Sequence, residues 1–371
     1  DEVVVKLTSM SLLKTDVNGE PQPYAATCQV SEEKDPSGEV INTTYRFELL
    51  DGLRFSDGKP VTADDVIFSI KVLCDPAYNG LSAVGSLPII GLHEYKYDRP
   101  DYEEIVASIK AQAEELPDGY VEKYIMEMAK ADVATYSKED IAAYLGIDLD
   151  PAMSEEAMTD FLINAYYEFE LEYAYDYYME GARAAYFNQV IEEKLADRDG
   201  SIAVPEIAGV IKIDDKTVDI KLKGVNPAAI WELGGIVVAP KHYYCEDEPD
   251  GELIKGRLDG IRQRSGKPLG AGPYIFQSYE NNVVTLKANE NYILGKPQTA
   301  NIKVVTSNAS NMLDSIILSE IDIAQVPATE DDLIKAEKNG LAVMTADFPG
   351  YGYIGINSVN IYDANVRKGL L

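Results

Sequence analysis

The stretch RFSDGKPVTADDVIFSI, residues 54–70, constrains the fold more than any other part of the chain. Its Asp57-Gly58 pair is typical of a tight turn, and the apolar residues after Thr62 recur at helical spacing. Thr62 and Asp65 resemble a capping box with Asp in place of the usual Glu, in which hydroxyl and carboxylate each satisfy a backbone N–H. The stretch therefore predicts a short return strand, a turn and a helix.

The acids of this stretch have a chemical alternative as a metal site or an acid–base pair. An EF-hand loop needs acids at its first, third and fifth positions and a Glu at the twelfth, and this stretch does not supply them. Asp64 and Asp65 also suit the positive end of a helix dipole. We therefore interpret the acids as scaffold and expect no metal here.

The charge balance excludes some classes of partner. The 371 residues hold 63 acids against 33 basic residues, a formal net charge of −30. Nucleic acids and anionic lipid both require a basic surface, so neither is expected as a partner. The charge indicates a self-repelling, solvated surface, and an acidic face that collects cationic ligands is the alternative.

Residues with catalytic or metal-binding potential are few. The cysteines Cys28, Cys74 and Cys245 are widely spaced, which disfavours zinc and leaves their redox state open. His93 and His242 stand apart and are interpreted as structural. The sequence has no P-loop and no G-x-S-x-G elbow, and its GAGPY segment precedes a strand, unlike a dinucleotide fingerprint. We expect neither an enzyme nor a cofactor.

Hydrophobic patterning predicts a mixed α/β protein. The apolar run 3–7 is read as a buried strand, 43–50 as an alternating strand and 207–224 as a hairpin turning at Asp214-Asp215. Strands are expected on both sides of the Asn281-Asn282 turn. The chain then predicts a strand at 301–307, a helix at 308–320, a strand at 321–326, a helix at 328–340 and a strand at 341–348.

Residues 101–198 form an acidic, tyrosine-rich segment with few Pro and Gly. Ser137 and Ser154 look like helix starts, and one or two long helices should end near Gly200. The tyrosines of its second half fall on more than one helix face, which favours helix packing; an aromatic surface for sugars or peptides is the alternative. They are Tyr166, Tyr167, Tyr173, Tyr175, Tyr177, Tyr178 and Tyr186.

Several segments, in order, resemble the family 5 extracellular solute-binding proteins, the oligopeptide and dipeptide receptors of ABC importers. TTYRFELLDGLRFSDGKPVTADDVIFSIKVLCDP looks like the family's signature segment. VVAPKHYY, GAGPYIFQSYENNVVTLKANENYILGKP, SIILSEIDIAQVP and GYIGINSVNIYDANVRKGLL fit later landmarks, with Ser319 where the family often has Gly. One such motif is weak evidence, but several in register are specific.

The resemblance implies a two-lobed periplasmic-binding-protein-like fold (type II, peptide-binding cluster) with a ligand cleft between the lobes. The first lobe is expected at 1–268, including a helical insertion at about 97–200, and the second at 269–371. Compared with the family, the chain starts late, without signal peptide or lipid-anchor cysteine, and stops inside the helix after Asn357. We therefore expect a truncated second lobe.

By the same resemblance, the protein captures oligopeptides or dipeptides and delivers them to a membrane permease. We expect a monomeric lipoprotein on the outer face of the membrane, or a periplasmic protein. Alternatives are a receptor for an oligosaccharide or a nickel–chelator complex, and an interaction module that uses the acidic helices. A hydrolase would need a nucleophile beside one of the histidines.

Candidate ligand contacts are the strand-end and lobe-junction positions of this fold. Trp231, the single tryptophan, lies either in the core or in a pocket, and the sequence leaves both open. Tyrosines suit a wet cleft that reads peptide backbones, because they offer both an apolar ring and a hydroxyl. The candidates are Ser9, Met10, Ser11, Trp231, Tyr274, Tyr351, Tyr353 and Asn357.

Overall fold

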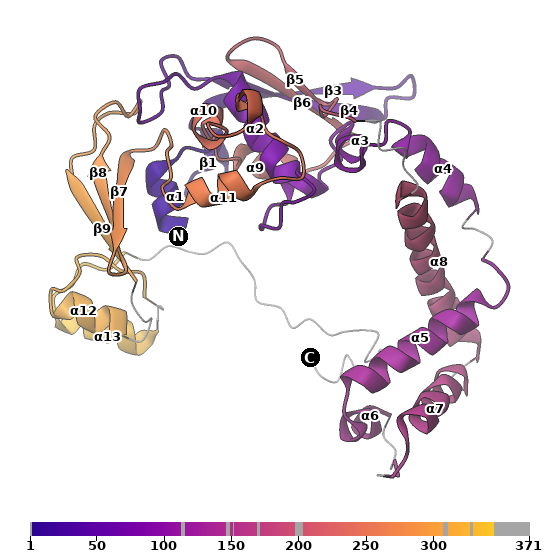
Figure 1. The fold of residues 1–371 in the computed structure, drawn as a ribbon. Helices are drawn as coiled ribbons and strands as arrows, with labels where there is room; N and C mark the ends of the chain where they lie inside the picture. The colour runs from indigo at the N-terminus through magenta and orange to yellow at the C-terminus, as the bar shows by residue number, and fades with distance from the viewer. Residues whose placement is uncertain are drawn as a thin grey trace. The chain divides into compact units, whose positions relative to one another are not determined.

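The computed structural model describes residues 2–112, 116–145, 149–150, 152–168, 171–196, 203–306, 311–326 and 329–344. The chain divides into two compact units. Residues 2–98 and 203–344 lie in the first unit, and the described residues from 99 to 196 lie in the second. The mixed α/β class is confirmed by the helices and sheets of the first unit (Figure 1).

The larger sheet of the first unit has four strands, all antiparallel to their neighbours, in the order β3-β4-β6-β5. The strand predicted at 43–50 is confirmed as part of β4, and the hairpin predicted at 207–224 is confirmed as β5–β6. The bounds are β3 Ala26–Lys34, β4 Val40–Leu49, β5 Val210–Lys212 and β6 Thr217–Lys223.

The two faces of β4 have different roles. Tyr45 and Phe47 are buried, while Arg46 between them points to the opposite face, as expected for the period-two alternation of a strand. Arg46 lies directly opposite Asp219 on β6, and its Nε and one terminal nitrogen each donate to a carboxylate oxygen at 2.7 Å. This bidentate pair fixes the β4–β6 register on the polar face.

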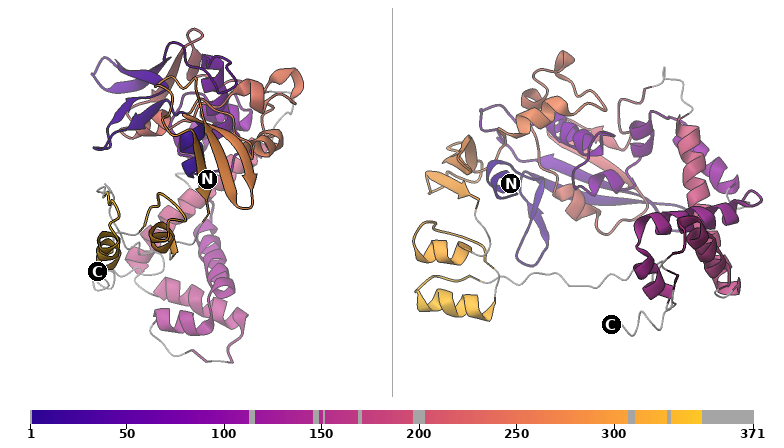
Figure 2. Two further views of the ribbon diagram at one scale, coloured as in Figure 1. Left: turned by 90° about the vertical axis from the view of Figure 1, so that its left-hand side faces the viewer. Right: turned by 60° about the horizontal axis from the view of Figure 1, so that its bottom comes forward.

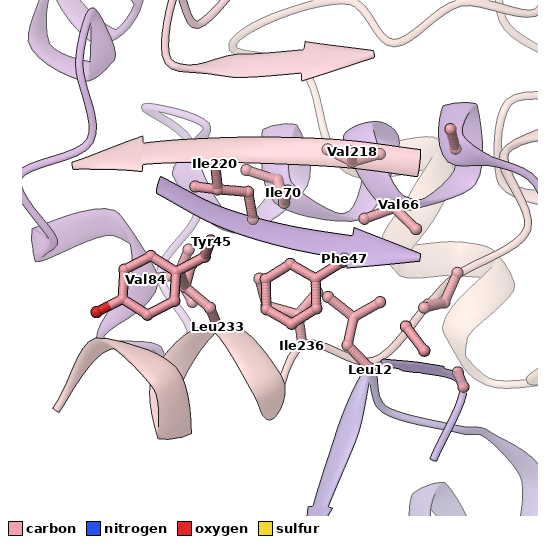
Figure 3. Close-up of a cluster of buried hydrophobic side chains, with 14 of the residues drawn as sticks. Leu12, Tyr45, Phe47, Val66, Ile70, Val84, Val218, Ile220, Leu233 and Ile236 are labelled. Atoms are coloured by element: carbon pink, nitrogen blue, oxygen red, sulfur yellow. The ribbon is translucent and has the colours of Figure 1, made fainter. Parts of the chain in front are cut away.

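The helix predicted after Thr62 is confirmed as α2 (Ala63–Cys74), which packs on the apolar face of this sheet. Its Val66 and Ile70 share one buried cluster with the apolar residues of β4 and β6. Leu12, Leu233 and Ile236 extend the cluster to the N-terminal segment and to α9 (Ala229–Gly234) (Figure 3). Burial of this apolar face is the main stabilising contribution in the first unit.

The predicted strand at 3–7 is wrong, because these residues form helix α1 (Glu2–Thr8). Val4 and Leu7 pack against the second sheet, while Val3 and Val5 are exposed. Tertiary packing of one helical face therefore overrides the strand preference of three successive valines.

The second sheet is antiparallel, in the order β7-β8-β9, with α1 packed against β7. The predicted turn between β7 and β8 is confirmed: Asn281 and Asn282 have φ values of 52° and 63°, the left-handed conformation that Asn tolerates in hairpins. The strand bounds are β7 Tyr274–Glu280, β8 Val283–Ala288 and β9 Asn301–Val305.

Beyond β9 the predicted alternation is only partly confirmed. The helices appear as the short α12 (Met312–Ile317) and as α13 (Glu330–Lys338), whose N-cap Thr329 accepts from the Asp332 N–H at 3.1 Å. The strand predicted at 321–326 is wrong, since these residues are irregular in the structure. Residues 341–344 form no strand either, and 345–348 lie outside the described residues. Within the described residues, neither 321–326 nor 341–344 pairs with β7–β9, so the apolar residues there have no ladder to join.

Short elements complete the first unit (Figure 2). They are β1 Leu13–Thr15, β2 Pro21–Pro23, η1 Val84–Ser86, α3 Leu92–Tyr97, α10 Lys241–Tyr244, η2 Pro249–Gly251 and α11 Asp259–Ser265. The three cysteines, whose redox state the sequence leaves open, are free in the structure. Burial raises the pKa of the Cys74 thiol to about 12, which makes it unreactive near neutral pH.

The second unit is helical, which confirms the helices predicted for 101–198. Ser137 and Ser154 precede helices as expected, and the Ser154 hydroxyl accepts from the Ala157 N–H at 3.1 Å. The helices are α4 Tyr102–Gln112, α5 Tyr120–Thr135, α6 Lys138–Leu145, α7 Glu155–Glu168 and α8 Leu171–Ala196.

Two small apolar clusters hold these helices together. One joins α5, α6 and α7 through Ile141 and Leu162, and the other joins α5 to α8 through Ile125 and Ala182. Tyr186 packs edge-on against a tyrosine of α5 with ring centroids 5.0 Å apart, in accord with the packing role expected for it. The side chains of the other tyrosines predicted there lie outside the described residues.

Candidate ligand-binding site

The segment Ser9–Leu13 connects helix α1 to strand β1. The Leu12 N–H donates to the Ile236 carbonyl at 3.0 Å, and the Val238 N–H donates to the Met10 carbonyl at 3.0 Å. The Met10 side chain is 1% exposed and belongs to the core. The segment is therefore fixed along its length by the residues that follow α9.

Two glycines of LGAGP lie against this segment. A Cβ on Gly270 would come within 2.3 Å of the Thr8 carbonyl oxygen, and one on Gly272 within 2.4 Å of the Ser9 nitrogen. The Gly272 N–H also donates to the Thr8 carbonyl at 3.0 Å. Only glycine permits this approach of two backbones, so the motif serves as a close junction between the N-terminal segment and β7.

The other candidate residues of this junction have local partners. The Ser11 hydroxyl donates to the Leu13 carbonyl at 2.6 Å. Tyr274 is buried and its hydroxyl donates to the Thr299 carbonyl at 3.1 Å. Ser9 is half-buried beside the two glycines. The structure thus brings Ser9, Ser11 and Tyr274 into one region, with the hydroxyls of the last two already hydrogen-bonded.

A tyrosine pair missed by the sequence prediction lies in the same unit. The hydroxyls of Tyr24 and Tyr292 are 3.0 Å apart, across 268 positions of sequence. Burial, followed by the hydrogen bond with Tyr24, raises the pKa of Tyr292. Lys14 lies 5.5 Å from the centre of the Tyr24 ring. No local pattern signals this pair, because its members come from separate elements.

Trp231 lines a pocket of about 650 Å³ in the first unit. The residue is 44% exposed, and its Nε1–H donates to the Gly19 carbonyl at 2.8 Å. This resolves the alternative that the sequence left open, in favour of a pocket residue. The other walls include Phe68, Leu81, Ile236, Tyr244 and Ile261.

Polar groups in this pocket are few. Among the described residues that line it, Glu232 is the only acidic or basic one. Serine hydroxyls and the Tyr244 phenol supply the other polar side chains. Burial raises the pKa of Tyr244 to about 12, so its hydroxyl remains protonated. An apolar cavity with a few directed polar groups is the usual form of a small-ligand site.

Helix α2 holds the floor of the pocket in place. The Ser69 hydroxyl accepts the Ala239 N–H at 2.9 Å, and both residues line the pocket. The Asp65 carboxylate accepts the Thr62 and Lys241 N–H groups, each at 2.9 Å. The capping box expected at Thr62 is confirmed, and the same carboxylate also binds a distant loop.

Asp57 confirms its predicted turn and has a partner that the sequence did not indicate. Its carboxylate accepts the Lys59 N–H at 3.0 Å and lies 2.7 Å from Nε2 of His242. His242 is thus packed and paired within the scaffold, and it also contacts the Phe55 ring edge-on. His93 stacks on Tyr97 with ring centroids 6.4 Å apart.

Comparison with known proteins adds the family. Residues 39–371 match the bacterial extracellular solute-binding proteins, family 5 Middle. The chain belongs to this family. Members of family 5 are solute-binding proteins of transport and not enzymes, in agreement with the non-catalytic expectation. Among the described residues, no helix is both long and apolar enough to cross a membrane.

Individual relatives of this family 5 chain are distant. A Brucella ovis protein named for ABC transporter peptide binding is 26% identical over 179 residues, which cover 46% of this chain and 33% of the relative. A Brucella abortus protein of similar name gives the same values. The matched region is about a third of the length of these relatives.

Solved structures align with most of this family 5 chain. One is the oligopeptide-binding protein of Bacillus subtilis in complex with a nonapeptide, which is 16% identical to this chain. The alignment covers 90% of this chain and 41% of the Bacillus subtilis chain, with a TM-score of 0.46. A periplasmic oligopeptide-binding protein of Borrelia burgdorferi is also 16% identical. Its alignment covers 87% of this chain and 42% of the Borrelia burgdorferi chain, with a TM-score of 0.47.

The remaining candidates of the sequence analysis are Tyr351, Tyr353 and Asn357. They lie outside the described residues, within the region that matches the family. Of the predicted set, the structure therefore locates five residues, in two places: the junction at Ser9–Ser11 and Tyr274, and the pocket at Trp231.

Proposed function

We propose that the protein is the substrate-binding component of an ABC importer, which captures peptides or a similar small solute outside the membrane and delivers them to a permease. The observation that carries this proposal is the family match over residues 39–371. The peptide-binding names of the Brucella relatives favour peptides over other solutes. We further propose that it acts as a monomer, either lipid-anchored or periplasmic.

The ligand is proposed to contact the junction and pocket residues of the first unit together with the second-lobe candidates. Ser9 and Ser11 offer backbone and hydroxyl groups beside the glycine junction. Such groups suit the backbone of a peptide, whose N–H and C=O groups are the same in every sequence. The contacts proposed are Ser9, Ser11, Trp231, Tyr274, Tyr351, Tyr353 and Asn357. The Met10 side chain, a candidate from the sequence, is buried in the core and is not among them.

The proposal is tested by native mass spectrometry of the full-length protein purified from its own cells. A ladder of bound peptide masses supports it and gives the preferred length. If the bound species is instead a single oligosaccharide or metal chelate, the protein is still a solute receptor, but its ligand is not a peptide. A ligand-free mass, combined with no thermal shift in peptide, sugar and nickel–histidine pools, contradicts the receptor function.

A further inference from the structure

The two chain ends of the first unit that flank residues 99–202 are joined to each other. The Val204 N–H donates to the Asp98 carboxylate at 2.9 Å. The Lys255 ammonium donates to the Tyr95 and Val204 carbonyls at 2.8 and 3.0 Å. These four residues, which we call the neck, all belong to the first unit. The first unit therefore holds both ends of the helical segment with its own groups.

The second unit also joins its own beginning to its own end. Its first and last described helices, α4 and α8, pack against each other. A terminal nitrogen of Arg99, which precedes α4, donates to the carbonyl of Lys194 near the end of α8 at 2.9 Å. Ile109 of α4 and Leu195 of α8 are both buried. The path of the helical segment is thus fixed by contacts among its own residues.

Each unit has an apolar core of its own. Among the described residues, the clusters around Ile125 and Leu162 take all their members from positions 116–182, in the second unit. The main cluster of the first unit, which contains Phe47 and Ile220, takes none from that range. A segment with its own core can fold alone, and about a hundred residues exceeds the roughly 60 that many independently folding domains have.

Two properties favour the second unit as the less stable one. Its described core is divided into two small clusters, whereas the main cluster of the first unit joins the four-stranded sheet, α2 and α9. Acidic residues also outnumber basic ones about threefold in residues 99–202, and an excess of one charge weakens a compact state by self-repulsion. We therefore expect the helices to unfold under milder conditions than the sheet.

We propose that the helical segment 99–202 is a separate folding unit, which unfolds while the first unit stays folded. The neck stays intact in that state, because its hydrogen bonds lie wholly within the first unit. The Trp231 pocket and the glycine junction stay folded as well, since their described residues also belong to the first unit.

The test follows the full chain through a urea series by pulsed hydrogen exchange and mass spectrometry. Peptides from α5 and α7 report the second unit, and peptides from β4 and β6 report the first. Fluorescence of Trp231, the only tryptophan, is a second probe of the first unit. We expect the α5 and α7 peptides to lose protection together, about 1 M urea or more below the Trp231 midpoint.

The matched variants are Ile125→Val in the second unit and Ile220→Val in the first, two buried residues that each lose one methylene. Ile125→Val should lower the urea midpoint of the α5 and α7 peptides by about 0.5 M and leave the Trp231 midpoint unchanged. Ile220→Val should do the reverse, because substitutions in separate cores do not couple.

Three outcomes would overturn the proposal. The first is one shared transition for all peptides, with both midpoints shifted equally by either variant. The second is loss of protection in β4 and β6 before the helices. The third is exchange of the peptide that contains Val204 together with α5 and α7, which would show that the neck opens with the helical segment.

The proposed function is not involved in this test, because no ligand is added. Independent unfolding of the helical segment in a protein that binds no peptide would refute the peptide receptor and leave the separate folding unit intact. A single shared transition in a protein that does bind peptides would have the opposite meaning.

Discussion

The carboxylate of Asp65 on α2 accepts the backbone N–H of Lys241 at 2.9 Å, across 176 positions of sequence. The same carboxylate accepts the Thr62 N–H, so one buried acid both begins the helix and binds the loop that leads to α10. Ser69, one turn further along α2, accepts the Ala239 N–H of the same loop. The pocket floor therefore depends on the start of this helix.

Asp65→Ala should lower the free energy of unfolding of the first unit by about 3 kcal/mol. The change removes a helix cap, worth about 1 kcal/mol, and leaves the partly buried Lys241 N–H without its acceptor, which costs about 1–3 kcal/mol. Denaturant unfolding followed by Trp231 fluorescence measures the loss. The control is Asp64→Ala, whose exposed pairing with Lys212 should contribute less than about 1 kcal/mol. Equal losses of stability in the two variants would show that the Asp65 hydrogen bonds to Thr62 and Lys241 contribute no more than the surface pair of Asp64.

Gly272→Ala should destabilise the first unit by about 2–3 kcal/mol. The new Cβ would lie 2.4 Å from the Ser9 nitrogen, and a backbone neighbour cannot rotate away as a side chain can. Gly266→Ala is the control, because the nearest atom to its Cβ lies 3.8 Å away. Thermal unfolding of both variants distinguishes a close-packed junction from a flexible linker, in which both substitutions would be harmless.

Lys255→Met should destabilise the chain segments on both sides of residues 99–202. The Lys255 ammonium donates to the Tyr95 and Val204 carbonyls at 2.8 and 3.0 Å and pairs with Asp98, so it joins the two chain ends that flank residues 99–202. Loss of these bonds should cost about 2–3 kcal/mol, since they involve a charged, partly buried group.

Limited proteolysis measures this effect at the residues next to Asp98 and Val204. Cleavage there should be faster in Lys255→Met than in wild type, while the exposed Lys267→Met should match wild type. Unchanged cleavage in Lys255→Met would mean that the flanking segments are held by other contacts.

The Asp57–His242 pair should contribute stability that depends on pH. Partial burial works to raise the pKa of Asp57, but the hydrogen bonds from the Lys59 N–H and from His242 outweigh it, so the pKa is lowered. A carboxyl with a lowered folded pKa stabilises fully above its unfolded value of about 3.9 and loses that effect as the pH falls through the folded value.

The stability difference between wild type and Asp57→Asn should therefore be largest above about pH 5 and shrink toward pH 2. Urea unfolding at a series of pH values measures this difference. A difference that is constant over the whole range would contradict the assignment of the lowered pKa to this pair.

Local patterns determined much of the scaffold. The capping box at Thr62, the Asn281-Asn282 turn, the β5–β6 hairpin and the helix starts at Ser137 and Ser154 were all predictable, because a few neighbouring residues decide each of them. The tertiary structure decided the state of residues 2–8, where packing of Val4 and Leu7 on a distant sheet outweighs a strand-forming run.

The candidate site depended mostly on tertiary structure. The sequence identified Trp231 as a core or pocket residue, and only the fold placed it beside α2 and α11. The glycines of LGAGP can be read from the sequence. The reason that glycine is required there cannot, because it is the close approach of the Thr8–Ser9 backbone. Such contacts join residues far apart in the chain, so they depend on how the elements pack, which local periodicity does not encode.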